Sequence, residues 1–305
     1  MLGGDCGEIL HRLQRDFQLG EQLFPQKAQC GEDALQSSAR GNEPALGPDA
    51  QGRIKVLYVG YSEVVLNRYL VGADVIEQSY FNDNGRWFRN AMASEPTVEV
   101  HHVTPHAVPT EFPASLNDLR AYNVVIFSDV GYNSMIFYPG LTPPYVYPLG
   151  PDRVGMVREF VEQGGGFLMV GGYLSFAGLN GIARWGGTEI ETLLPVSIAR
   201  TDDRAEIVQG FRFDIVQPEH PIVAGLPWAS AGWTLCGYNK LTLKSGATLV
   251  ASYQDDPIIA CWEHQGGRTA IFSSDFAPHW AGDFVRWSHY ATFWKQMVHW
   301  LAKRT

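Results

Sequence analysis

One short stretch, residues 164–178 (GGGFLMVGGYLSFAG), constrains the fold of this chain more than any other. It predicts the end of a helix, a short apolar strand and a tight glycine-rich corner into the next segment. In several α/β enzymes such a corner carries the catalytic nucleophile at the carboxyl edge of a parallel sheet. Here the corner holds Gly171, Gly172 and Tyr173 without a cysteine, and the nearest serine is Ser175.

Three apolar runs in the first half of the chain predict further strands. Residues 53–60 (RIKVLYVG) and 123–131 (NVVIFSDVG) are rich in Val and Ile, as buried parallel strands are. Residues 97–103 (TVEVHHV) alternate between apolar and polar side chains. These strands are separated by helical patterns, and this alternation predicts a mostly parallel α/β sheet.

Four helices are expected between these strands and the strand of residues 164–178. One helical stretch follows Glu63, and others cover residues 82–94 and 116–121. Residues 152–163 (DRVGMVREFVEQ) place their apolar side chains on one helical face, and Asp152 is suited to cap the start of this helix.

The second half of the chain adds a late β region. Gly266 and Gly267 lie between two of its β runs and predict a hairpin. An aromatic helical face over residues 284–301 predicts a final helix that packs on the sheet. The predicted β runs are 190–198, 206–216, 247–252, 257–263 and 268–273.

Two segments lack such patterns. Residues 1–52 contain several helix breakers and predict a flexible N-terminal extension to a domain over 53–305. Residues 137–151 form a Pro- and Tyr-rich loop of unusual length, as in lids and contact surfaces, and are a candidate surface for a homo-oligomer.

Composition excludes several classes of function. The formal net charge of −9 argues against a nucleic-acid partner, which needs a basic surface. No apolar run is long enough to span a membrane and no signal peptide is evident, so a cytoplasmic protein is expected. The four cysteines lack metal-ligand spacing and no phosphate-loop motif occurs, so neither a metal nor a cofactor is predicted.

The order of these motifs resembles the class I glutamine amidotransferase-like superfamily over residues 53–305. The resemblance is carried by VLYVG (56–60), VVIFSDVG (124–131), the glycine corner and GGRTAIFSSDFAPHW (266–280). GGYLSFAG (171–178) and SSDFAPHW (273–280) point to the branch called "putative glutamine amidotransferases". The resemblance implies a flavodoxin-like three-layer sandwich with a mostly parallel central sheet and an additional late β region.

The chain departs from that superfamily at the catalytic position. Its glutaminases need a cysteine thiolate at the corner, because attack of the thiolate on the amide gives a thioester. No cysteine occurs between Val170 and Leu174. Hydrolysis of glutamine by the family mechanism is therefore not expected.

Several other residues are candidates for chemistry at this edge of the sheet. Ser175 is a candidate nucleophile, with His279 as its base and Asp275 to orient the imidazole. The alternative is that Asp275 caps a turn while His279 packs under the last helix. The candidate ligand-binding residues are Tyr173, Gly172, Glu63, Asp129 and Trp280.

Three functions remain open from the sequence. The first is a protein without glutaminase activity that binds a small molecule or a partner at the degenerate crevice. The second is a hydrolase that uses Ser175, His279 and Asp275. The third is a structural subunit of a homo-oligomer.

Overall fold

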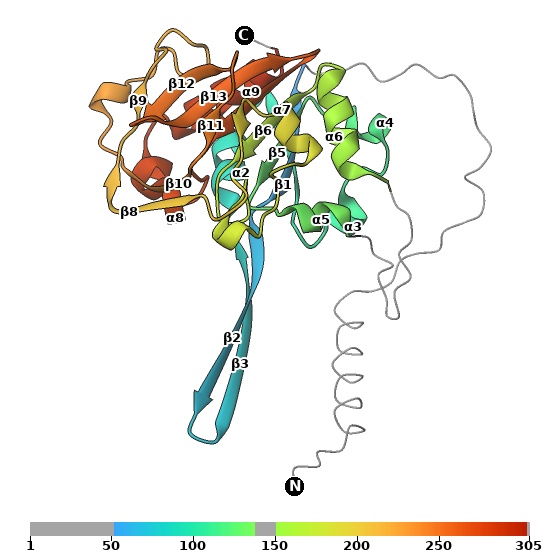
Figure 1. Cartoon of the computed structure of the whole chain (residues 1–305), viewed down its shortest axis with the longest axis vertical. Helices are drawn as coiled ribbons and strands as arrows, with labels where there is room; N and C mark the ends of the chain where they lie inside the picture. The colour runs from blue at the N-terminus through green and yellow to red at the C-terminus, as the bar shows by residue number, and fades with distance from the viewer. Residues whose placement is uncertain (1–51, 138–150, 304–305) are drawn as a thin grey trace, which may run out of the picture. The chain divides into compact units, whose positions relative to one another are not determined.

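The computed structural model describes residues 52–137 and 151–303 (Figure 1). Its central sheet has eight strands in the order β4-β1-β5-β6-β14-β13-β12-β9. The first five are parallel and the last three antiparallel. The strands of this sheet are β1 (Ile54–Gly60), β4 (Val98–Val103), β5 (Val124–Ser128), β6 (Gly166–Val170), β9 (Asp214–Ile215), β12 (Thr248–Tyr253), β13 (Asp256–His264) and β14 (Gly267–Phe272). The predicted α/β architecture with a late β region is confirmed.

Three pairs of strands lie outside the central sheet. They are β2 (Ser62–Val71) with β3 (Asp74–Asp83), β8 (Arg204–Phe211) with β10 (Leu235–Asn239), and β7 (Val196–Ser197) with β11 (Thr242–Leu243). The helices are α2 (Arg86–Ala93), α3 (Val108–Glu111), α4 (Leu116–Leu119), α5 (Tyr132–Ile136), α6 (Arg153–Glu162), α7 (Glu189–Leu193), α8 (Pro278–Ala281) and α9 (Tyr290–Leu301). Three short 3-10 turns complete the described chain: η1 (Leu179–Gly181), η2 (Trp228–Ser230) and η3 (Gly282–Arg286).

The central sheet is buried on both faces, which explains why its strands are continuously apolar. Along β1, Val56 and Tyr58 belong to the core on one face, whereas Leu57 and Val59 belong to the core on the other. Successive side chains of a strand point to opposite faces, so each of these runs supplies both cores. Helices α2 and α9 cover the first face, and α6 and α7 the second (Figure 1).

The predicted start of α6 is confirmed. The Asp152 side chain accepts a hydrogen bond from the backbone N–H of Gly155 at 2.9 Å. This bond satisfies one of the N–H groups that the first turn of a helix leaves without a partner.

The helix predicted after Glu63 is wrong. This stretch forms the antiparallel hairpin β2–β3, with Val71 paired with Asp74 across a two-residue turn. Gly72 in the turn has φ +63°, which glycine adopts without the strain that a Cβ would cause. The hairpin projects away from the helices that cover the sheet (Figure 1). A helix in this segment would have no surface on which to pack its apolar side chains, and packing supplies most of the stability of a helix.

Two further boundaries differ from expectation. The strand predicted over residues 190–198 is largely helix α7, and only Val196–Ser197 is β-structure. Ile190 and Leu193, one turn apart in α7, are both buried against the sheet, which fixes the helical form. The final helix begins at Tyr290 after η3, later than predicted.

The extension over residues 1–52 and the Pro- and Tyr-rich loop lie outside the described residues, apart from Gly52, Phe137 and Pro151. The role of the extension and of the loop therefore remains a prediction. Within residues 52–137 and 151–303, no helix is long and apolar enough to cross a membrane.

Candidate functional site

The glycine corner lies at the carboxyl end of β6, as predicted. The N–H of Gly171 donates to the carbonyl of Phe272 at 2.8 Å, and a Cβ on Gly171 would lie 2.0 Å from the carbonyl oxygen of Ser273. Only glycine fits so close to the neighbouring backbone. Residues 171–178 are not helical, and the next helical turn is the short η1. The corner therefore offers no helix N-terminus to stabilise a thiolate or another anion.

A buried carboxylate and a buried amide hold this corner in place. Asp203 accepts hydrogen bonds from the N–H groups of Ala177 and Gly178, both at 2.9 Å. The side chain of Asn239 donates to Asp203 at 2.7 Å and accepts from the N–H of Gly172 at 3.0 Å. The sequence analysis did not predict either residue. Asp203 directly precedes β8 and Asn239 ends β10, so both are far from the corner along the chain.

The Ser175 hydroxyl connects two strand ends. It donates to the carbonyl of Val170 at 2.6 Å and accepts from the N–H of Asp129 at 3.0 Å. Ser175 is 1% exposed, and no hydrogen bond joins it to His279 among the described residues. The predicted Ser175–His279–Asp275 triad is therefore not assembled: the serine proton is held by a backbone carbonyl, and only the other two residues meet.

Two non-glycine residues at the head of the sheet adopt left-handed backbone conformations. Tyr61, after β1, has φ +43°, and Asp129, after β5, has φ +46°. Such residues cost about 1–3 kcal/mol each and cluster at functional sites. Both residues lie where open α/β sheets bind their ligands.

Asp129 is a carboxylate in an environment that disfavours its charge. Burial raises its pKa to about 7, and the nearby Asp275 carboxylate adds to the rise. The N–H of Leu174 donates to Asp129 at 2.5 Å and opposes that effect. A Cβ on Gly172 would lie 2.7 Å from this carboxyl, so the second corner glycine makes room for it. Near neutral pH, Asp129 is thus able both to donate and to accept a proton.

Asp275 and His279 form a pair behind Asp129. Asp275 is fully buried and accepts hydrogen bonds from the Tyr61 hydroxyl at 2.5 Å and the N–H of Ala277 at 2.8 Å. Its carboxylate lies 3.7 Å from Nδ1 of His279. This carboxylate raises the pKa of His279, whereas burial raises the pKa of Asp275 itself. Asp275 therefore caps the turn through Ala277 and also lies beside His279, so it makes both of the contacts that the sequence offered as alternatives.

Tyr173 forms one wall of the site. Its hydroxyl donates to Glu206 at 2.5 Å, and its ring lies edge-on to the His279 imidazole with centroids 4.6 Å apart. Trp280 is 1% exposed and stacks on His279 from behind, so it supports the imidazole without lining the site. Glu206 was not predicted, because its strand β8 reaches the corner only in the folded chain.

These side chains enclose a cavity of about 420 Å³, which is of the size that binds small molecules. Tyr173 lines this cavity without filling it, and Glu63 lies at its edge, where it accepts a hydrogen bond from Asn82 at 2.9 Å. Of the eight predicted site residues, Glu63, Asp129, Tyr173 and His279 line the cavity, and the other four do not. The cavity is lined by Tyr61, Ser62, Glu63, Asn82, Asn84, Pro105, Asp129, Tyr173, Leu174 and His279.

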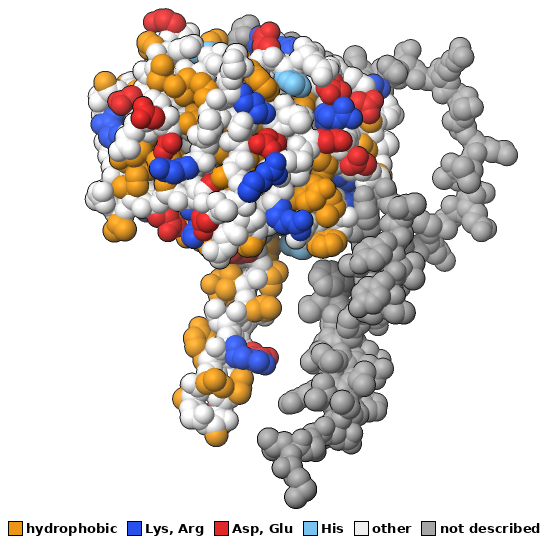
Figure 2. All heavy atoms as spheres, viewed as in Figure 1, with side chains coloured by type: hydrophobic (Ala, Val, Ile, Leu, Met, Phe, Trp, Pro, Cys, Tyr) orange, Lys and Arg blue, Asp and Glu red, His pale blue; other side chains and the backbone are white. Residues whose placement is uncertain are grey.

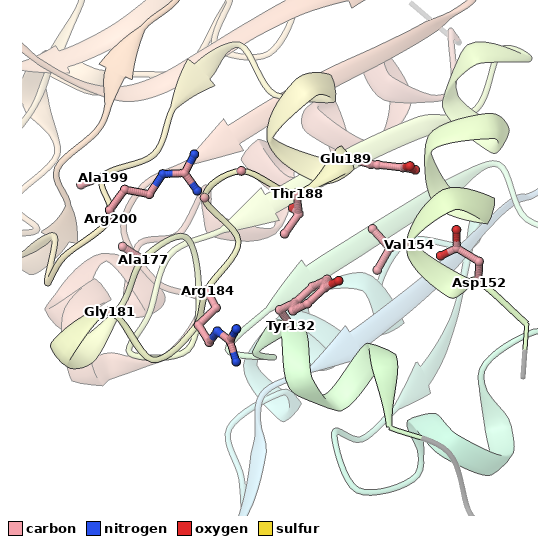
Figure 3. A pocket seen from close by; sticks show the side chains of 12 residues that line it. Tyr132, Asp152, Val154, Ala177, Gly181, Arg184, Thr188, Glu189, Ala199 and Arg200 are labelled. Atoms are coloured by element: carbon pink, nitrogen blue, oxygen red, sulfur yellow. The ribbon is translucent and has the colours of Figure 1, made fainter. Parts of the chain in front are cut away.

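A second cavity, of about 690 Å³, lies beside α6 and α7 (Figure 3). Figure 3 shows Arg184 and Arg200 on one side of it and Glu189 on the other. Its two acids are already engaged, because Arg158 pairs with Glu189 at 3.0 Å and Asp152 caps α6. We therefore regard the smaller cavity, with its strained and perturbed residues, as the candidate site.

Neither cysteine of the described chain lies in the glycine corner: Cys236 is in β10, which pairs with β8 outside the central sheet, and Cys261 is in β13. Cys261 is buried in the middle of β13, with its sulfur 3.4 Å from Nε2 of His220. Burial raises the pKa of the Cys261 thiol to about 12 and lowers the pKa of His220. Both groups are therefore neutral at pH 7, unlike the thiolate and imidazolium of a cysteine nucleophile.

A family model described as "Putative glutamine amidotransferase" matches residues 55–303. The chain belongs to this amidotransferase-like family. Two solved structures are similar to it: the cytoplasmic protein STM3548 from Salmonella typhimurium, with a TM-score of 0.76, and STM1381 from Salmonella typhimurium LT2, with 0.75. Each is 30% identical and is matched over 81% of this chain and 99% of its own. No curated protein matches the chain.

Membership of the amidotransferase-like family confirms the resemblance seen in the sequence. It also sharpens the departure, because the corner at residues 170–174 has no thiol in this member. What this member retains is an imidazole next to a buried carboxylate, beside an open cavity.

The Asp275–His279 pair gives a direct prediction. Replacing Asp275 with Asn removes the largest cause that raises the His279 pKa, so we expect this pKa to fall. A pH titration of the histidine ring signals by NMR measures it. Glu206→Gln is the control and should lower the His279 pKa much less, because Glu206 is a minor cause. An unchanged His279 pKa in Asp275→Asn would mean that the pair does not interact.

Proposed function

We propose that this amidotransferase-like protein binds a small polar molecule in the cavity at the head of the sheet and does not hydrolyse glutamine. The observation that carries the proposal is the meeting of Asp129 and His279 in one cavity of about 420 Å³, with Asp275 buried behind them. Perturbed ionisable groups that converge on a cavity are typical of ligand sites.

The groups in the cavity indicate the chemistry of the ligand. His279 turns Nδ1 toward Asp275, and no hydrogen bond to its Nε2 occurs among the described residues. Nε2 is therefore left for a ligand: it accepts a hydrogen bond when the imidazole is neutral and donates one when the ring is protonated. Asp129 and Glu63 supply carboxylate oxygens on the other walls. Two acids and one imidazole favour a molecule that carries N–H donors and at least one acceptor, such as an amine or amide.

Two observations support the absence of glutaminase activity. The corner lacks both a cysteine and a following helix N-terminus, the two features that would generate a thiolate there. The Ser175 hydroxyl is bound by backbone groups in both directions and is 1% exposed, so it does not replace the cysteine. The hydrolase alternative therefore has less support than binding.

Thermal unfolding in the presence of defined probes tests the proposal. The probes are L-glutamine, ethanolamine and the dicarboxylate glutarate. We expect the amide or the amine, at about 100 times its Kd, to raise the Tm by about 5–10 °C. Glutarate should have no effect at pH 8, because the Asp129 side chain, with a pKa of about 7, is then a carboxylate that repels it. Ammonia release from L-glutamine should equal that of a blank without protein.

Matched variants separate this cavity from the rest of the chain. Asp129→Asn and His279→Gln should lose the shift, measured against the Tm of each variant alone. Arg184→Ala, which alters the second cavity, should keep it. Stabilisation by glutarate in preference to the amine and amide would contradict the proposed ligand class. Release of ammonia would show that this protein hydrolyses glutamine without a cysteine at the corner.

The two Salmonella relatives are named cytoplasmic proteins, which supports a cytoplasmic location here.

A further inference from the structure

The hairpin β2–β3 exposes an unusual concentration of apolar side chains (Figure 2). Nine of the fourteen large hydrophobic side chains exposed on the described chain lie on it. A two-stranded hairpin without packing on one face is marginally stable in water, and monomers rarely expose such a patch. The nine are Val64, Leu66, Tyr69, Leu70, Val71, Val75, Ile76, Tyr80 and Phe81.

One face of the hairpin carries the most exposed of these side chains. Directly paired residues of antiparallel strands lie on the same face. The face that we call the even face is formed by the pairs Val64–Phe81, Leu66–Ser79, Arg68–Glu77 and Leu70–Val75. Its five large apolar side chains are all more than half exposed, from 53% to 79%. On the opposite face the four large exposed apolar side chains, Tyr69, Val71, Ile76 and Tyr80, are exposed from 46% to 57%. The even face therefore carries more of the exposed apolar side chains, and its two leucines are the most exposed of all nine.

The pattern of the even face is complementary to itself. An apolar pair at the base of the hairpin, Val64–Phe81, and an apolar pair near its tip, Leu70–Val75, enclose a more polar centre. A two-fold axis across the strands at the level of Asn67 places the base pair of one copy on the tip pair of another. It also places Ser79 opposite Glu77 of the second copy, so that a hydroxyl meets the carboxylate.

We propose that the even face packs on the even face of a second copy of this chain, with the two hairpins antiparallel. The Arg68–Glu77 ion pair is formed within each hairpin, so neither charge is left unpaired by the contact. The Leu66 side chain of one copy covers the aliphatic part of Arg68 in the other. Antiparallel hairpins also place the two sheets at opposite ends, where they do not collide.

This arrangement reaches the candidate site. By the same two-fold relation, the Gly72 turn of the second copy lies at the level of Ser62, which lines the cavity together with Glu63. Each copy would thus cover the edge of the other's cavity with its hairpin turn. The proposal concerns assembly alone and holds whether or not the cavity binds an amine or amide.

Molar mass in solution, measured by light scattering on the full chain, tests the interface. We expect a dimer or a multiple of it for the wild type. Leu70→Asp should weaken self-association at least about 100-fold, because it buries an unpaired charge. Ile76→Asp on the opposite face and Val208→Asp, at a remote site that is 97% exposed, are the controls and should associate as the wild type does. Circular dichroism and thermal unfolding confirm that each variant is folded.

Disulfide trapping tests the register. In the doubly substituted chain Val64→Cys/Leu70→Cys, the two sulfurs cannot pair within one hairpin, because six residues of strand span about 20 Å. We expect a dimer linked by two disulfides on oxidation, and only weak linking with either single substitution. A monomeric wild type would overturn the proposal and leave the face to another partner. The even-face interface would be overturned if Ile76→Asp dissociated the dimer and Leu70→Asp did not. It would also be overturned if the doubly substituted chain assembled but formed no disulfides between its copies.

Discussion

Asp203→Ala is expected to lower the free energy of unfolding by about 3–5 kcal/mol, since it leaves three buried donors without an acceptor at about 1–3 kcal/mol each. The donors are the N–H groups of Ala177 and Gly178 and the amide of Asn239. Burial raises the pKa of Asp203, whereas these hydrogen bonds lower it, so they offset part of the cost of burying the carboxylate. Urea denaturation with a linear extrapolation measures the loss.

The isosteric variant Asp203→Asn serves as the matched control. It keeps one acceptor oxygen but turns an amide toward one of the N–H donors, so an intermediate loss is expected. It also provides a folded sample if the alanine variant does not fold. A loss below about 1 kcal/mol in Asp203→Ala would show that the corner does not depend on this carboxylate.

Asp129→Asn is expected to stabilise the protein at pH 8, although most single substitutions destabilise a fold. The folded-state pKa of Asp129, about 7, lies above the ordinary value of 3.8, so the folded state binds the proton more tightly than the unfolded state. Stability of the wild type therefore falls as pH rises from about 4 to about 7. At about 1.4 kcal/mol per unit of pKa, we expect a gain of about 2–4 kcal/mol for the variant at pH 8.

Urea denaturation at pH 4.5 and pH 8 measures this effect. The asparagine oxygen still accepts the N–H of Leu174, so the backbone contact remains. Asp74→Asn, at an exposed position in the hairpin, is the matched control and should leave the pH dependence unchanged. Equal stabilities of Asp129→Asn and wild type at pH 8 would mean that the Asp129 carboxylate is not disfavoured in the folded chain.

A gain in stability at Asp129 combined with a loss of ligand binding would identify a functional residue. Proteins retain strained or desolvated groups where function requires them, and substitutions there commonly stabilise the fold. The left-handed backbone of both Tyr61 and Asp129 adds to the cost that this site already bears.

Local patterns predicted most of the central sheet, because its strands are buried on both faces and are therefore continuously apolar. They failed for the hairpin β2–β3. Its apolar side chains occur on both faces of the ribbon, so the alternation that identifies a half-buried strand is missing. Residues such as Leu66 and Leu70 are also four apart, which is the spacing of a helical face.

The site was predicted in part. The corner and the pairing of His279 with Asp275 follow a strand end closely in sequence, so they could be located from the chain alone. The role of Ser175 could not, because its hydroxyl is oriented by a carbonyl and an N–H of two strand ends. Asp203 and Glu206 approach from β8 and its preceding loop only after folding.

The sequence by itself determined three features: a sheet of apolar strands, a glycine corner at the end of one of these strands, and the absence of a cysteine sulfur at that corner. The tertiary structure alone decided how acidic or basic the remaining groups are. The proton affinity of Asp129 depends on the water excluded around it and on a second carboxylate more than a hundred residues away in the chain, and no local pattern encodes either.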